Sequence, residues 1–243
     1  MSDLEPRIRE AVRSFWRTRV KQAAEQGRAS GAKDAGARAA VTGGAQMDGF
    51  VSLVRELLLE HGAPLDGIHH QKRLELPGWY RAEKSWDLVL VIEGELVAAI
   101  EFKSQIGPSF GNNFNNRTEE ALGSATDLWA AFREGAFRPS ARPWLGYLMM
   151  LEECERSTNP VSVRESNFAV FPEFKGASYQ RRYSILIEKL LRDRLYDGGC
   201  FLLSRDSGAE RGDYTEPNPE LSFVRFITPL LAQVQSRMRL GKP

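Results

Sequence analysis

The stretch SWDLVLVIEGELVAAIEFKSQ, residues 85–105, decides the fold, because it predicts a β-hairpin with two mostly apolar arms. Side chains alternate between two faces along each arm, and both faces are largely apolar. On the second arm, for example, Leu96 and Ala98 are expected on one face and Ala99 on the other. Strands that are apolar on both faces are typical of the centre of a sheet. We therefore expect this hairpin to be central and covered on both sides.

Three charged residues interrupt the apolar pattern: Asp87 on the first arm, and Glu101 and Lys103 on the second. Because side chains change face at every residue, Asp87 and Glu101 share a face only if the connecting loop has an odd number of residues. A three-residue loop at 92–94, with Gly94 in the left-handed conformation, satisfies that condition. Asp87 then lies opposite or diagonal to Glu101, with Lys103 one pleat further along the same face.

These charges between apolar strands predict a ligand, since burying unpaired charges is costly. Asp87 and Glu101 supply hard oxygens that Mg²⁺ accepts, so they are candidate metal ligands and catalytic residues. Lys103 is the third candidate catalytic residue, placed to orient a water molecule or to stabilise charge on a reacting phosphate. In the alternative interpretation, Asp87 begins a solvated edge strand and the other two form an exposed ion pair. The short pattern is common, and the hairpin context favours the metal site.

These residues and their surroundings resemble the PD-(D/E)xK nuclease superfamily, and the XhoI-type type II restriction endonucleases in particular. The motifs that carry the resemblance are GGAQMDGF at 43–50, WDLVLVIEG at 86–94 and EFKSQIGPSFGNNFNNR at 101–117. The resemblance extends over nearly the whole chain. Trp86 stands where the superfamily often has a proline before the aspartate, a frequent but dispensable feature.

The resemblance implies an α/β fold of the restriction-endonuclease type, with a mixed central sheet flanked by helices and a helical N-terminal arm. It also implies Mg²⁺-dependent cleavage of double-stranded DNA by a homodimer at the palindrome CTCGAG, after the first C, leaving 5′ overhangs. A cognate DNA methyltransferase is then expected in the same host. Two alternatives stay open: a repair or junction nuclease of the same superfamily, and a protein of this fold that binds DNA without cutting it.

The chain reads as one nuclease domain, residues 1–243, without internal repeats. An amphipathic N-terminal helix is expected within 1–26, a flexible Gly- and Ala-rich basic loop at 27–45, and the catalytic core at 46–243. The loop either orders on DNA or is an idle linker. Hydrophobic periodicity predicts core helices at 46–61, 118–134, 179–196 and 221–238, and strands at 69–76, 144–151 and 200–203. The last of these helices is expected to be interrupted by Pro229. Gly198 and Gly199 are expected to end the third of these helices.

Composition limits the function classes without choosing one. The 243 residues are 42% hydrophobic and 27% charged, yet the net charge is only +1, so no overall basic field indicates nucleic acid. An acidic metal centre that offsets a basic rim accounts for this balance. The two cysteines form no disulfide framework, and no apolar run approaches the roughly 20 residues of a membrane span. Since the chain starts with acidic residues and not with a signal peptide, we expect a cytoplasmic protein.

Asp48, inside the motif at 43–50, is a candidate third metal ligand. The superfamily resemblance suggests this role, since a helix before the hairpin often lends an acidic group to the metal. An acidic residue in the first turn of a helix could equally serve the helix dipole. Zinc is not indicated, because His69 and His70 are adjacent on an expected strand and point to opposite faces.

Two segments are candidate DNA contacts. The basic, aromatic turn at 77–80 is flanked by Lys72, Arg73 and Lys84, although a solvated turn would read the same. The polar segment 107–117 follows the strand that carries Lys103 and is expected to be a loop. Asparagines can read base edges or hold phosphates, but Asn and Gly also favour ordinary turns. The candidate residues in this loop are Asn112, Asn113, Asn115, Asn116 and Arg117.

Overall fold

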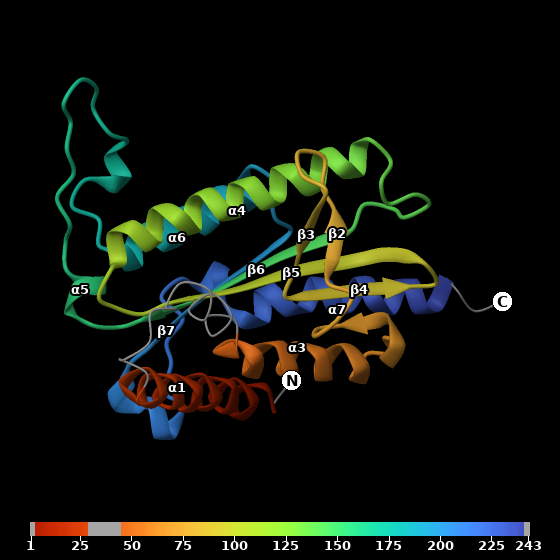
Figure 1. Ribbon diagram of the computed structural model, residues 1–243, viewed down its shortest axis with the longest axis horizontal. Helices are drawn as coiled ribbons and strands as arrows, with labels where there is room; N and C mark the ends of the chain where they lie inside the picture. Colours follow the sequence, from red (N-terminus) through yellow and green to blue (C-terminus); the bar gives the residue numbers. More distant parts are fainter. Residues whose placement is uncertain (1–2, 29–44, 241–243) are drawn as a thin grey trace.

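The computed structural model describes residues 3–28 and 45–240, so most of the expected loop at 27–45 lies outside the described residues. The described chain forms a five-stranded sheet and a separate two-stranded sheet, with helices on both faces of the larger one (Figure 1). The main sheet has the order β1-β4-β5-β6-β7. Its strands are β1 (Ile68–His69), β4 (Leu88–Ile92), β5 (Glu95–Gln105), β6 (Trp144–Glu152) and β7 (Gly198–Ser204). The small sheet pairs β2 (Glu75–Pro77) with β3 (Glu83–Ser85).

The hairpin that the alternation predicts consists of β4 and β5, and it lies inside the main sheet. β4 pairs antiparallel with β1 and with β5. On its other side β5 pairs parallel with β6, which in turn pairs parallel with β7. The sheet is therefore mixed, as expected, and β5 stands at the change from antiparallel to parallel pairing.

Helices cover the two faces of the sheet as separate layers (Figure 1). One layer holds α4 (Phe110–Arg133) and α6 (Tyr179–Arg192), and the other holds α1 (Leu4–Arg28), α3 (Asp48–Glu60) and α7 (Phe223–Leu240). Leu88 and Leu90 pack in the hydrophobic cluster of the second layer, whereas Val89 and Ala99 pack in that of the first. Burial of the hairpin on both sides is thereby confirmed.

The remaining elements are short. They are α5 (Glu155–Thr158) and four 3₁₀ turns at Leu65–Gly67, Pro172–Phe174, Asp206–Arg211 and Pro219–Leu221. The strand expected at 144–151 is confirmed in β6, and the helix expected at 221–238 is confirmed in α7. The interruption expected at Pro229 is wrong, because α7 continues through that residue. No helix within 3–28 and 45–240 is long and apolar enough to cross a bilayer.

The strand expected at 69–76 is wrong, because the chain bends within it. β1 pairs with β4 in the main sheet, whereas β2 pairs with β3 in the small one. Between them Arg73 has a positive φ of 58°, a conformation that an extended strand does not contain. The bend releases β2 and β3 from the main sheet as a separate hairpin.

The two glycines expected to end the helix at 179–196 have another role. α6 ends at Arg192, and Gly198 and Gly199 begin β7. A Cβ at Gly198 would stand 2.2 Å from the Trp144 ring, and one at Gly199 would stand 2.4 Å from Ile187. These positions need glycine because neighbouring side chains approach the backbone closely, not because a helix stops there.

Candidate active site

The turn between β4 and β5 decides which residues share a face of the sheet. The chain reverses through two residues, Glu93 and Gly94, with φ of 52° and 79°, as in a type I′ turn. The three-residue loop expected from the sequence is therefore wrong. A two-residue turn alone would place Asp87 and Glu101 on opposite faces, but a β-bulge in β5 restores the match.

The bulge is the extra residue Val97, which no residue of β4 opposes. It reverses the alternation, so Leu96 packs in the same cluster as Ala99, although the sequence pattern placed these two on opposite faces. Beyond the bulge the paired register continues toward the start of β4, and Asp87 falls opposite Glu101. The expected shared face is thus reached by a turn and a bulge together.

Asp87 is held just before β4 by two backbone contacts. Its N–H donates to the carbonyl of Ile100 (3.2 Å), and its Oδ2 accepts from the N–H of Phe102 (2.7 Å). The side chain nevertheless remains 34% exposed. Its carboxylate is therefore fixed in place and still accessible to a ligand.

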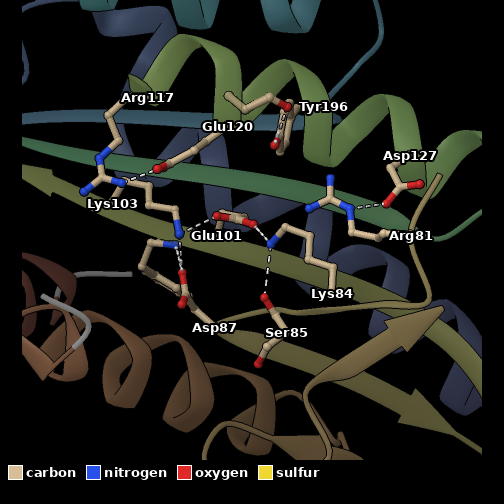
Figure 2. A network of polar contacts seen from close by, with 12 residues as sticks. Arg81, Lys84, Ser85, Asp87, Glu101, Lys103, Arg117, Glu120, Asp127 and Tyr196 are labelled. Atoms are coloured by element: carbon tan, nitrogen blue, oxygen red, sulfur yellow. Dashed lines mark hydrogen bonds and ion pairs between the residues drawn. The ribbon is translucent and has the colours of Figure 1, made fainter. Parts of the chain in front are cut away.

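Glu101 and Lys103 on the neighbouring strand complete a charged cluster with Asp87 (Figure 2). Lys103 Nζ stands 2.5 Å from Glu101 Oε2 and 3.4 Å from Asp87 Oδ2. The Glu101 side chain is only 3% exposed. The structure thus brings together the three residues that the sequence singled out as catalytic.

Lys84 is a fourth member of this cluster. The sequence grouped it with the basic residues of a turn that faces DNA, but on β3 its Nζ binds Glu101 Oε1 and the carbonyl of Ser85 (3.1 Å). The same ammonium lies 4.2 Å from the centre of the Trp86 ring. Both oxygens of Glu101 are therefore paired with lysine side chains, one from β5 and one from the small sheet.

Burial and the two lysines set the charge states in the cluster. Burial raises the pKa of Glu101, but Lys103 and Lys84 outweigh it and hold that pKa below its ordinary value. Burial lowers the pKa of Lys103, yet Glu101 and Asp87 outweigh it and raise that pKa. For Asp87, burial raises the pKa more than Lys103 lowers it, and Glu101 adds to the rise. Asp87 is thus the carboxylate that an added cation would stabilise in its ionised form.

The chemistry of these donors fits a divalent cation. Asp87 and Glu101 present hard oxygens from neighbouring strands, and Mg²⁺ accepts such ligands while keeping several waters. Within the described ranges, no group of three or more carboxylate, imidazole or thiol side chains forms a complete metal cage. An ion held by these two carboxylates would therefore keep positions for water and for a phosphate oxygen.

Asp48, the candidate third ligand, lies at the margin of the cluster. It is the first residue of α3 and its side chain is exposed. Partial burial raises its pKa, His70 opposes the rise, and the charge of Asp87 adds to it. The two carboxylates are therefore close enough to influence each other, although the structure does not join them in one set of contacts.

The polar segment 107–117 is not a loop, because α4 begins within it at Phe110. Phe110 stacks on Tyr179 of α6 at 5.8 Å between ring centres, and Phe114 packs edge-on against Tyr183 at 5.1 Å. Aromatic contacts of this kind stabilise the helix and outweigh the preference of Asn and Gly for turns. The error of the sequence interpretation lies in ignoring the spacing of the two phenylalanines, which is that of a helix.

The first turns of α4 carry most of the candidate DNA contacts. Asn113 is half-buried, whereas the other three asparagines are exposed: Asn112, Asn115 and Asn116. Arg117 is half-buried, pairs with Glu120 (2.5 Å) and lies above Lys103 in Figure 2. Lys72 and Arg73 are exposed in the bend between β1 and β2. The candidates therefore lie on α4 and in this bend, and Arg117 adjoins the charged cluster.

Asp127 of α4 is a second buried carboxylate, and the sequence did not indicate it. Its Oδ1 accepts from the N–H groups of Trp79 and Tyr80 (2.8 Å each), and its Oδ2 accepts from Nε of Arg81 (2.7 Å). Burial raises the pKa of Asp127, but these donors outweigh it and hold that pKa below its ordinary value. The residue ties the β2–β3 hairpin to α4. No local pattern marks it, since its partners lie 46 to 48 residues away in the chain.

The chain is similar to known proteins over most of its length. A family model described as Restriction endonuclease XhoI matches residues 26–216. The type II restriction enzyme BstVI of Geobacillus stearothermophilus is 49% identical over 213 residues, which cover 86% of this chain and 95% of that protein. The type II restriction enzyme XhoI of Xanthomonas vasicola is 49% identical over 160 residues, 64% of each chain. AbrI of Azospirillum brasilense, also a type II restriction enzyme, is 39% identical over 237 residues, 97% of each. No solved structure matches the chain significantly.

Proposed function

The chain belongs to the XhoI family of restriction endonucleases and is a type II site-specific deoxyribonuclease, and from that premise we propose a specific reaction. The enzyme cuts double-stranded DNA at CTCGAG after the first C, leaves 5′ overhangs and requires Mg²⁺. The sequence of the site rests on the XhoI-type motifs at 43–50, 86–94 and 101–117. The cleavage chemistry rests on one observation, the convergence of Asp87, Glu101 and Lys103 on one face of a hairpin.

Each member of the cluster has a role in this proposal. Asp87 and Glu101 hold the Mg²⁺ ion, and Asp48 at the margin is the candidate for a further contact. When bound, the ion supplies positive charge at the reacting phosphate and acidifies a water molecule. Lys103, held between the two carboxylates, orients the attacking water or stabilises negative charge on the phosphate. The low exposure of Glu101 keeps solvent from weakening these interactions.

Lys84 gives the cluster a way to exist before the metal binds. Glu101 is nearly inaccessible to solvent, and an unpaired buried carboxylate would destabilise the fold. Lys84 and Lys103 neutralise it instead. Since Lys84 comes from the small sheet by a long flexible side chain, it can leave Glu101 to an incoming cation and turn to a DNA phosphate. In this proposal Lys84 contacts Glu101 in the free protein and a DNA phosphate in the complex.

DNA binding is assigned to two segments, the first turns of α4 and the bend between β1 and β2. The first carries Arg117 and the four neighbouring asparagines, and the second carries Lys72 and Arg73. Symmetric cleavage of both strands of a palindrome requires two active sites related by a two-fold axis, so the working unit is a homodimer. A host that makes this enzyme must protect its own sites, and a cognate DNA methyltransferase therefore accompanies it.

The test is cleavage of a plasmid that contains a single CTCGAG site, with Mg²⁺ and, in parallel, with EDTA. We expect one linear product with Mg²⁺ only, and sequencing of its ends places the cut after the first C. A plasmid in which one base of the site is changed is the control and stays circular. Cutting of both plasmids would indicate a repair or junction nuclease, and binding without cutting would indicate a non-cleaving DNA-binding protein.

The homodimer is tested separately by analytical ultracentrifugation of the protein alone and bound to a duplex that carries the site. A two-to-one complex of protein and duplex is expected. A species that stays strictly monomeric at working concentration, both free and bound, would contradict the dimer.

A further inference from the structure

The tip of the β2–β3 hairpin exposes two aromatic side chains that the active site does not use. Trp79 is 55% exposed and Tyr80 is 72% exposed. Large aromatic side chains are usually at least half-covered in folded proteins, and an exposed neighbouring pair indicates a contact surface. The tip is the basic, aromatic turn that was expected to meet DNA, but the sequence did not indicate what its two aromatic side chains would contact.

The tip is held in place by a buried carboxylate. Asp127 of α4 is 3% exposed and accepts hydrogen bonds from the backbone N–H groups of both Trp79 and Tyr80. Gly78 makes this contact possible, because a Cβ there would stand 2.4 Å from Asp127 Oδ2. A tip that only closed a turn would not need a buried charge to fix it. The backbone of the two aromatic residues is therefore set in a defined position while their side chains remain open to solvent.

The tip belongs to the same element as an active-site residue. Lys84, which contacts Glu101, is four to five residues from Tyr80 and Trp79 on this hairpin. At about 3.3 Å per residue the tip lies within roughly 17 Å of Lys84, or about five base steps of a duplex at 3.4 Å each. Figure 2 shows Asp127 farther along the helix that carries Arg117 and Glu120, with Arg81 of the hairpin beside it. The tip is therefore close enough to meet a duplex whose phosphate reaches the cluster.

The charge at the tip favours a nucleic acid over a second protein surface. Arg81 is the charged residue next to the aromatic pair, and it uses Nε for Asp127 while its side chain remains 46% exposed. Its terminal nitrogens can therefore approach a phosphate. The strands of the hairpin carry the exposed residues Glu75 and Glu83, and Lys84 of β3 is paired with Glu101, so the exposed positive charge of the hairpin is Arg81.

We propose that Trp79 and Tyr80 contact the bases of the bound DNA duplex as an aromatic wedge, and that Asp127 is the positioning residue that holds them there. This rests on the proposed function, since the duplex is the one held at the catalytic cluster. Aromatic or apolar side chains inserted at a base step partly unstack it and bend the duplex. A tip of this kind would increase the affinity for DNA and would favour sequences whose base steps unstack easily.

The experiment measures binding of the full-length protein to a CTCGAG duplex, with Ca²⁺ replacing Mg²⁺ to suppress cutting. The double variant Trp79→Ala/Tyr80→Ala should bind about 5- to 100-fold more weakly, the range that loss of base–aromatic stacking produces. Trp79→Phe/Tyr80→Phe should restore most of the affinity. A duplex with 2-aminopurine in place of an adenine within or beside the site should brighten with wild-type protein and not with the alanine variant. Phe168→Ala removes another exposed aromatic residue, 89% exposed, and is the control that should change nothing.

Asp127 is tested by two substitutions. Asp127→Asn keeps an oxygen that can accept from both backbone N–H groups, so its affinity should stay near that of wild type. Asp127→Ala removes that oxygen and should weaken binding in the wild-type background but not in the Trp79→Ala/Tyr80→Ala background, since the two changes act through the same contact. Circular dichroism confirms that each variant is folded.

Three results would overturn the proposal. One is unchanged affinity and unchanged 2-aminopurine signal in the folded double variant, while wild-type protein still binds and cuts. Another is a loss of affinity that follows dissociation of the protein into monomers in ultracentrifugation, which would assign the tip to a contact between two copies. Third, equal losses for Asp127→Asn and Asp127→Ala would remove Asp127 from the argument. Failure of wild-type protein to bind or cut any duplex would instead reject the proposed function itself.

Discussion

Glu101 and Asp127 are carboxylates with equally small exposure, 3% each, but their partners differ in kind. Glu101 is paired with the flexible side chains of Lys84 and Lys103. Asp127 accepts from two backbone N–H groups and one guanidinium. The backbone donors cannot leave without opening the hairpin, whereas an ammonium group can be exchanged for another cation. We therefore propose that exchangeable partners, more than burial, distinguish a carboxylate that takes part in chemistry from one that only holds the structure together.

The largest expected effect is the loss of DNA cleavage when Glu101, but not Asp127, is changed. Glu101→Ala and Asp87→Ala should each lower the rate of plasmid cleavage by a factor of about 10³ or more, because each removes a proposed metal ligand. Folding and specific DNA binding in Ca²⁺ should be largely retained. Asp127→Asn is the matched control and should cut at a rate close to that of wild type. Binding lost together with cleavage in a folded Glu101 or Asp87 variant would count against their assignment as metal ligands.

Lys103 should show the next largest effect. Lys103→Ala should lower the single-turnover cleavage rate by about 10²- to 10⁴-fold, because the ammonium is assigned to the transition state. DNA affinity should change little. A variant that instead binds DNA poorly but cuts normally at saturating enzyme would assign Lys103 to substrate binding.

The free energy of unfolding should depend more on Asp127 than on Glu101, the reverse of the order expected for cleavage activity. Asp127→Ala should lower the free energy of unfolding by about 2–3 kcal/mol, because two backbone N–H groups and the Arg81 guanidinium lose the carboxylate that they share. Glu101→Gln should change it by less than about 1 kcal/mol, since both lysines can turn toward solvent. Urea unfolding in EDTA measures both values. Equal losses of unfolding free energy in the two variants would contradict the distinction between the two carboxylates, because they would show that the lysine partners stabilise the fold as much as the backbone donors do.

The pair Arg117–Glu120 extends the comparison to DNA recognition, since it too joins exchangeable side chains. If Arg117 holds a phosphate, Arg117→Ala should weaken binding to all sequences and flatten the salt dependence by about one unit of slope. If an asparagine at 112, 113, 115 or 116 reads a base, its alanine variant should lose about 1–3 kcal/mol of discrimination at one position. Binding to cognate and single-base-changed duplexes at several salt concentrations distinguishes these cases. No change in any of the five variants would move the recognition surface to Lys72 and Arg73.

The smallest predicted effect tests exchange at Glu101 directly. Lys84→Met keeps much of the aliphatic packing but removes the competing ammonium. Calorimetric titration of DNA-free protein should show about tenfold tighter Ca²⁺ binding, a fraction of the roughly 4 kcal/mol between unit charges 4 Å apart at an effective dielectric of 20. Unchanged or weaker Ca²⁺ binding would mean that Lys84 does not occupy the position of the cation.

Local patterns predicted the framework of this molecule but not its long-range contacts. The alternation over 85–105 gave the hairpin and its burial on both sides, since period-two patterns follow directly from strand geometry. It could not reveal the bulge at Val97, because every residue around that position is apolar and fits either face. The helical start of α4 was missed because its stabilising partners, Tyr179 and Tyr183, lie on a different helix.

The same limit explains why the sequence revealed neither the contact of Lys84 with Glu101 nor the burial of Asp127. The sequence predicted Lys84 as a DNA contact, and nothing in its neighbourhood shows that its side chain reaches Glu101, 17 residues on. Asp127 sits in the middle of a helix and looks like any solvated aspartate in the sequence. Only the packing of the β2–β3 hairpin on α4 buries it. The convergence of Asp87, Glu101 and Lys103 was predictable because these residues lie close in sequence, on the two arms of one predicted hairpin.

The bulge at Val97 also limits how this gene can change in length. A turn of two residues and one extra residue in β5 together keep Asp87 and Glu101 on the same side of the sheet. Deleting the bulge residue Val97 would leave a regular two-residue hairpin with Asp87 still opposite Glu101. Adding or losing one residue in a paired part of either arm, with the turn and the bulge kept, would instead send one carboxylate to the opposite helical layer, into a hydrophobic cluster. The bulge is therefore a position at which natural variants can be one residue shorter and keep both carboxylates on one side of the sheet.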